Sequence, residues 1–207
     1  MDIQFYGANC VTFTYKGARI VVDDNLAELG GKSILKADDV ALFTGPHPAE
    51  VNARLVVDGP CEYEVSDISV MGFAAQAHVD GAGTKNATMF KLIAGDLSVL
   101  VTGHIYPELS DAQQEAIGLV DVMIVPVGGN GYTVDPVGAI KLIKEIEPKV
   151  VIPTHFADKA LNFPVPQQEF ANAIKELGME PQEAVAKLRV KPTELTDVAH
   201  LIVLEKS

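Results

Sequence analysis

Four of the five histidines follow apolar runs, at the points where these runs give way to turns or loops. Neutral imidazole is a frequent ligand of zinc and similar ions, and it can also transfer a proton near neutral pH. If the preceding strands are neighbours that run in compatible directions, the four rings can converge in one crevice. The four residues are His47, His78, His104 and His155. The fifth, His200, lies inside the alternating run AHLIVLE and is interpreted as structural.

The elements that would position these histidines change in type along the chain. The first half alternates short β-rich runs with turns such as Lys16-Gly17 and Gly95-Asp96, which predicts hairpins. From Ser110 onward the pattern predicts a helix SDAQQEAIG capped by Ser110-Asp111, strand VDVMIVPVGG, helix PVGAIKLIKEIE capped by Asp135, and strand KVVIPTHF. The helix PQQEFANAIKELG, ending at Gly178, and the strand HLIVLE complete the chain. We therefore expect one domain over residues 1–207, with two sheets and helices outside them.

Charge and composition narrow the class of partner. The chain has 207 residues and a formal net charge of −12, without a cluster of Lys or Arg, which argues against binding to nucleic acid or to an anionic membrane. A small-molecule substrate fits better. The start MDIQFYG lacks a signal-peptide pattern, and Cys10 and Cys61 lie far apart without CxxC spacing. These features predict a cytoplasmic protein with no thiolate metal site.

The chain resembles the metallo-β-lactamase superfamily in six blocks: YGANCVTFTYKGARIVVDD, ALFTGPHPAE, GPCEYEVSDISVMGF, LVTGH, VDVMIVPVGGNGYTVDP and EPKVVIPTHF. Within the superfamily, it is similar to the small branch of ascorbate-6-phosphate-lactonase-like hydrolases. The resemblance extends from about Ile3 to Phe156. It implies an α/β fold, a four-layer αββα sandwich, with a metal site along one edge of the sheets.

The metal-binding motif of that family is altered in this chain. The pattern His-x-His-x-Asp-His falls on Gly45, His47, Ala49 and Glu50. The histidine of the third block falls on His78 and the final histidine on His155, whereas the aspartate that bridges two ions falls on His104. An imidazole nitrogen serves one ion where a carboxylate can serve two. The resemblance therefore implies at most one tightly held ion.

Two further positions bear on the comparison, and two hypotheses follow. Gly7-Ala8-Asn9 departs from the Gly-His-Ser or Gly-His-Ala of many relatives, while Asp23 matches an aspartate that commonly ends the second long strand. In one hypothesis the chain kept the fold and lost the metal centre, leaving a binding module. In the other, a remodelled site holds one ion through His47, His78 and His104. The second is favoured because positions 50 and 104 exchange one ligand type for another.

The remodelled site would perform metal-assisted hydrolysis. One divalent transition-metal ion, zinc in the first place with manganese, iron or nickel as alternatives, would lower the pKa of a bound water toward about 7. Glu50 or His155 would complete the coordination or transfer the proton as catalytic base. Asp80 could orient an imidazole, and Asn130 or Tyr132 could border the pocket. The expected substrate is a small ester, lactone or phosphoester.

Overall fold

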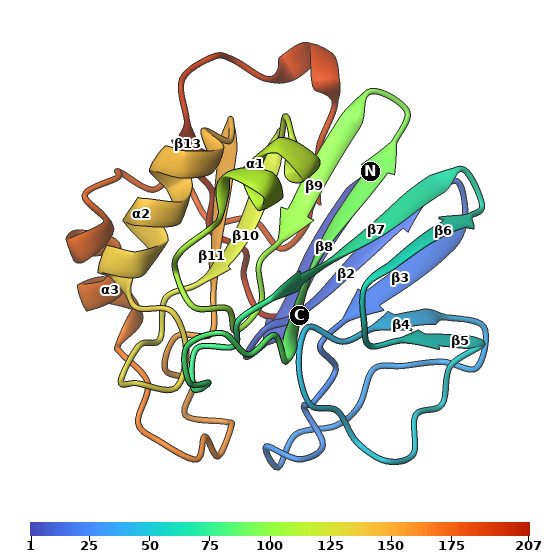
Figure 1. The fold of residues 1–207 in the computed structure, drawn as a ribbon, viewed down its shortest axis with the longest axis horizontal. Coiled ribbons are helices and arrows are strands. Elements are labelled where there is room, and N and C mark those ends of the chain that lie inside the picture. Colours follow the sequence, from blue (N-terminus) through green and yellow to red (C-terminus); the bar gives the residue numbers. More distant parts are fainter.

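Two mixed β-sheets face each other in the computed structural model, which describes residues 1–207 (Figure 1). The first sheet has the spatial order β12 (Leu188–Arg189), β1 (Asp2–Gly7), β2 (Cys10–Tyr15), β3 (Ala18–Val22), β4 (Val40–Leu42) and β5 (Leu55–Val57). The second has the order β13 (His200–Leu201), β11 (Val150–Thr154), β10 (Val122–Pro126), β9 (Leu97–Val101), β8 (Ala87–Ala94), β7 (Ile68–Ala75) and β6 (Cys61–Val65). Hairpins supply the antiparallel pairs, as the turn residues predicted.

Three helices pack together on one side of the second sheet (Figure 1). They are α1 (Asp111–Ile117), α2 (Pro136–Ile146) and α3 (Phe170–Leu177). The predicted caps are present. The Ser110 side chain accepts from the Gln113 backbone amide, and Asp135 Oδ1 accepts from the Gly138 amide at 2.7 Å. Because these caps satisfy amides that the first turn leaves unpaired, the helices begin where the sequence indicated.

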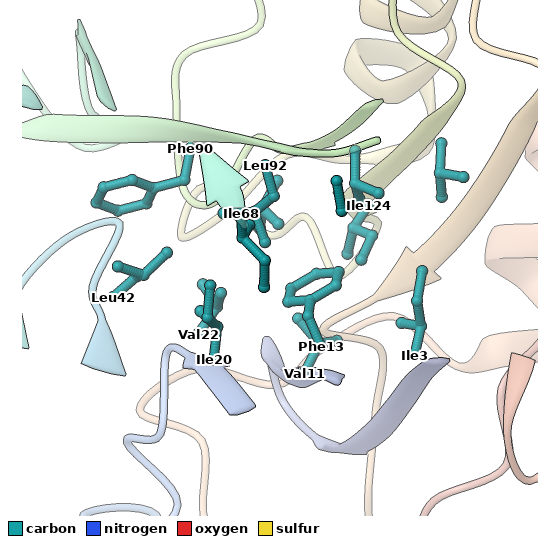
Figure 2. Close-up of a cluster of buried hydrophobic side chains, with 14 of the residues drawn as sticks. Ile3, Val11, Phe13, Ile20, Val22, Leu42, Ile68, Phe90, Leu92 and Ile124 are labelled. Carbon is teal, nitrogen blue, oxygen red and sulfur yellow. The ribbon is translucent and has the colours of Figure 1, made fainter. Parts of the chain in front are cut away.

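The main hydrophobic core lies between the two sheets. Twenty-five buried residues form it, and Figure 2 shows Phe13 and Ile20 of the first sheet facing Phe90 and Leu92 of the second. Alternation along each strand places every second side chain in this layer. A second cluster of 17 buried residues fills the space between the second sheet and the helices. The strands are thereby fixed from both faces, and the loops at their ends have a rigid base.

Irregular segments cover the outer face of the first sheet, whereas helices cover the outer face of the second. Leu26 and Leu161 come from two such segments and pack on Cys10 and Val21 of the sheet. The Asp24 carboxylate organises the first segment, because its Oδ2 accepts from the Ser33 hydroxyl and from two backbone amides at 2.7 to 3.0 Å. Such local side-chain bonds stabilise a turn without regular secondary structure.

The C-terminal region differs most from the sequence-based expectation. The predicted strand HLIVLE pairs as a strand only over His200–Leu201, and Leu204 and Lys206 make isolated bridges. The short strand β12 and the 3-10 turn Pro192–Glu194 have no periodic pattern that would predict them. Elements of two or three residues depend on partners distant in the chain. None of the helices combines the length and apolar character needed to cross a lipid bilayer.

Candidate active site

A pocket of about 220 Å³ opens where several strands end. His78, His104 and His155 line it, and they follow β7, β9 and β11. The first sheet contributes Asp23 after β3, and Thr44, Gly45 and Pro46 after β4. The expectation that strand ends bring the histidines into one crevice therefore holds for three of the four.

Backbone contacts between loops bring the three rings together. The His78 amide donates to the His104 carbonyl at 2.7 Å, and the His155 amide donates to the Ala8 carbonyl at 2.7 Å. The rings of His104 and His155 are perpendicular, with centroids 4.5 Å apart. The Tyr132 ring lies 5.5 Å from the first and 5.8 Å from the second. These contacts join both sheets at the pocket.

Two glycines permit this close approach. Gly103, with φ of +63°, lies so near β4 that an added Cβ would be 2.2 Å from Thr44 Oγ1. An added Cβ on Gly128 would be 2.1 Å from both the His155 carbonyl and Gln167 Oε1. No other residue fits either position without displacing its neighbours. By contrast, a Cβ on Gly45 would meet nothing within 4 Å.

A buried polar network forms one wall of the pocket. The Asp23 carboxylate accepts from the Thr44 amide at 2.7 Å, the Thr44 hydroxyl at 2.6 Å and Asn9 Nδ2 at 2.5 Å. The Thr154 hydroxyl in turn donates to Asn9 Oδ1 at 2.6 Å. Burial raises the pKa of Asp23, and the bonds from Thr44 and Asn9 oppose that shift. Since its oxygens already accept three donors, Asp23 positions the strand ends.

The two adjacent histidines are held neutral at pH 7. Burial lowers the pKa of His104 to about 4, although a hydrogen bond with the Tyr132 backbone opposes the change. Burial also lowers the pKa of His155 to about 3, with a further decrease from its neighbour His104. Gln167 Nε2 donates to the Val165 carbonyl, so Gln167 Oε1 accepts from His155 Nδ1 at 3.0 Å. The lone pair of His155 is therefore on Nε2.

Two pocket-lining residues carry buried polar atoms without a partner in the protein. They are His78 Nδ1 and Asn25 Oδ1. Buried polar groups are normally paired, so unpaired atoms at a pocket indicate a place for a ligand. Asn25 is fixed in orientation, because its Nδ2 donates to the Pro46 carbonyl at 3.1 Å.

His47 does not line this pocket, which corrects the expectation that it shares a cleft with the other three. Its Nδ1 lies 2.7 Å from the Pro48 carbonyl, its Nε2 lies 3.2 Å from Asp58 Oδ2, and its ring stacks on Phe43 at 4.6 Å. Both ring nitrogens therefore have partners within the protein. The short Gly-Pro-His-Pro turn directs the side chain toward Asp58.

The other predicted residues have varied positions. Glu50 is exposed and does not line the pocket. Asp80 Oδ2 accepts from the Ala77 amide at 3.1 Å and its Oδ1 accepts from Asn86 Nδ2 at 3.2 Å, so it closes its own loop. Tyr132 does line the pocket, as expected. His200 lies on β13 and does not line the pocket, and its Nε2 is 2.9 Å from the Thr196 hydroxyl.

Sequence reasoning missed two pocket residues, Asn25 and Glu28. Both belong to the irregular segment after β3, which has no periodic pattern. Their one available signal was proximity in sequence to Asp23, the aspartate at the end of a strand. Burial raises the pKa of the Tyr132 phenol, and the nearby carboxylate of Glu28 raises it further.

Residues 2–155 match the family model described as the beta-lactamase superfamily domain. The chain belongs to this superfamily. A candidate zinc-dependent hydrolase of the metallo-β-lactamase superfamily from Thermotoga maritima is 25% identical, with 99% of this chain and 98% of that chain covered and a TM-score of 0.73. The metallo-β-lactamase fold implied by the resemblance is thereby confirmed, with irregular segments in place of an outer helix layer on the first sheet.

Two more solved structures share the fold. A candidate metal-dependent hydrolase from Parabacteroides distasonis is 14% identical, covers 98% of this chain and 93% of its own, and has a TM-score of 0.65. CmlA, a diiron β-hydroxylase from Streptomyces venezuelae, is 15% identical, covers 86% of this chain and 49% of its own, and has a TM-score of 0.59. Members of the superfamily thus bind divalent metal ions, zinc or iron.

Three imidazoles of the pocket have the donor chemistry of metal ligands. His78 has an unpaired buried nitrogen, and His104 and His155 are neutral, as metal-ligating imidazoles must be. The bond from His155 to Gln167 resembles the anchoring bonds that orient metal ligands. As the side chains lie, however, no three His, Cys, Asp or Glu residues converge on a point that would hold an ion.

Proposed function

We propose that the protein is a metal-dependent hydrolase that uses a single divalent ion, zinc in the first place, held by His78, His104 and His155. The observation that carries the proposal is that these three imidazoles line one small pocket of a metallo-β-lactamase fold. Manganese, iron or nickel would suit three nitrogen donors as well. In this proposal His155 is a ligand, and His47 takes no part.

The ion would supply a water whose pKa is lowered toward about 7, and therefore a hydroxide at neutral pH. The protein's own residues have separate tasks. Gln167 fixes the His155 ring through Nδ1, so that Nε2 is the free donor. Glu28 is the carboxylate in the lining that is not occupied by hydrogen bonds, and it takes the role of base that the sequence had assigned to Glu50. Tyr132, beside both histidines, would donate to a substrate oxygen.

The substrate in this proposal is a small molecule with an ester, lactone or phosphoester bond, in keeping with the similarity to ascorbate-6-phosphate-lactonase-like hydrolases. A pocket of about 220 Å³ suits a compact substrate. We place the protein in the cytoplasm, because Cys10 and Cys61 are free thiols far apart in sequence. The acidic net charge supports a partner other than nucleic acid or an anionic membrane.

Metal analysis of variants tests the ligand set. We expect the protein, freed of metal and then incubated with zinc, manganese, iron or nickel, to retain at most one ion per chain. His78→Ala, His104→Ala and His155→Ala should each lose it, whereas His47→Ala and His200→Ala, the matched histidine controls, should keep it. Two ions per chain at full occupancy, or equal loss in His47→Ala, would refute the site.

One observation favours the alternative, a binding protein that has lost the metal centre: the side chains do not converge in the present arrangement. This alternative predicts that none of the four metals is retained and that no ester, lactone or phosphodiester is hydrolysed with any of them. A ligand could still occupy the pocket, since its unpaired atoms do not require a metal.

A further inference from the structure

The charge of the pocket restricts what it can bind. Among its 16 lining residues there is no Lys or Arg, whereas two carboxylates, Asp23 and Glu28, are present. An anion that entered would meet the carboxylates of Asp23, which is buried, and Glu28, which is exposed, without a Lys or Arg side chain in the lining to compensate for them.

The lysines nearest in sequence do not alter this picture. Lys32 comes three residues after Leu29, and Lys85 comes two residues before Ala87, yet neither lysine lines the pocket. Both are exposed, so water and salt screen their charges. The lining itself therefore contains acidic side chains, the buried Asp23 and the exposed Glu28, and no basic one.

One of the unpaired polar atoms, Asn25 Oδ1, also favours a ligand that donates hydrogen bonds. Asn25 Oδ1 is an acceptor only, and its orientation is fixed by the bond from Asn25 Nδ2 to the Pro46 carbonyl. Hydroxyl, amide or ammonium groups of a ligand could pair with it, whereas the oxygens of a phosphate or a carboxylate could not. The charge of the lining and its hydrogen-bonding capacity thus both favour a ligand that is not anionic and that donates hydrogen bonds.

We infer that the pocket selects small substrates that are uncharged or cationic at the group next to Glu28 and Asn25, and that it rejects phosphorylated or carboxylated ones. The inference rests on the proposed hydrolase function and narrows it to esters and lactones. Glu28 is the specificity-determining residue, because Asp23 is committed to three donors within the protein.

Three acetate esters of similar size test this selection: acetylcholine, its neutral isostere 3,3-dimethylbutyl acetate, and 4-acetoxybutyrate. They share the bond to be cleaved and differ in charge. Binding to metal-free protein is measured from the NMR signals of the five histidine rings, which does not depend on turnover. We expect signals of His78, His104 and His155 to shift, with 4-acetoxybutyrate binding about tenfold or more weakly than the neutral ester.

Variants locate the origin of the selection. Glu28→Gln should reduce the difference between the anionic and neutral esters, and Glu28→Lys should reverse it. Lys85→Gln, the control on the neighbouring exposed loop, should leave the order unchanged. Equal or tighter binding of 4-acetoxybutyrate by the original protein would overturn the inference, and so would the absence of histidine shifts with all three esters.

The outcome separates the two proposals. If the esters bind in the expected order but none is hydrolysed with zinc, manganese, iron or nickel, the selectivity holds and the hydrolase function fails. If hydrolysis occurs and anionic esters are preferred, the hydrolase function holds and the selectivity fails.

Discussion

His47 and the pair His104–His155 occupy equivalent places in the chain, each just past a buried strand, yet their surroundings differ in the folded molecule. His47 is partly exposed and lies between the Pro48 carbonyl and the Asp58 carboxylate. His104 and His155 are packed edge to face, and burial lowers the pKa of each to about 4 and about 3. Both nitrogens of His47 have partners in the protein, whereas burial keeps the rings of His104 and His155 neutral.

The comparison shows why position at a strand end does not by itself identify a ligand. A ring whose two nitrogens both have partners in the protein has no nitrogen free to bind a metal. A buried ring that donates a hydrogen bond from one nitrogen stays neutral near pH 7. Its other nitrogen keeps a lone pair that can bind a metal. The neighbours of a histidine, more than its location after a strand, determine its chemistry.

The largest expected effect concerns the backbone that brings the neutral pair into place. Gly103→Ala should destabilise the fold by about 3 kcal/mol or more, because the new Cβ would overlap Thr44 and φ is +63°. Chemical denaturation measures the loss. Gly45→Ala, in open space at the same pocket, is the matched control and should change stability by less than about 0.5 kcal/mol. Similar effects for both would contradict the close approach.

The next effect is a loss of stability in acid. The pKa of His155 is about 3 in the folded chain and 6.5 when solvated, so the unfolded chain binds the proton first as pH falls. The stability of metal-free protein should therefore be complete above pH 6.5 and decline by about 3 kcal/mol for this residue by pH 4. Urea unfolding at a series of pH values measures the slope, which His155→Gln should flatten. An unchanged slope in that variant would show that the ring is solvated.

A third prediction adds a donor to the pocket. Gly45 lies where the family motif has its first histidine, and a Cβ there meets nothing within 4 Å. Gly45→His should therefore be tolerated and should strengthen zinc binding, by about tenfold or more, if the imidazole joins the neutral set. Competition with a chromogenic chelator measures the affinity. Weaker zinc binding in Gly45→His would argue that the ion lies elsewhere.

The smallest expected effect is at His47. His47→Gln should cost less than about 1 kcal/mol, because the partner Asp58 is 64% exposed and its attraction is screened. Zinc binding should be unchanged. Thermal denaturation and metal analysis on the same samples measure both quantities. A loss of zinc comparable with that in His155→Ala would erase the distinction between the two regions.

Much of the fold could be predicted from the sequence, because the signals were local. The turn residues Lys16-Gly17 and Gly95-Asp96 and the caps Ser110 and Asp135 act within a few residues, and the structure has these hairpins and helices. The segment containing Asn25 and Glu28 gave no such signal. Its shape depends on Asp24 and on the packing of Leu26 against Leu161, 135 positions away in the chain.

By itself, the sequence determined the order of the elements, the superfamily and the placement of four histidines after strands. The tertiary structure decided which of these histidines meet. Charge state and ligand capacity depend on burial and on hydrogen-bond partners, and for His155 these include Ala8, on the opposite sheet, and Gln167, in a later loop. Such partners are brought together only when the two sheets close on their shared core, and so no local pattern could distinguish His47 from His155.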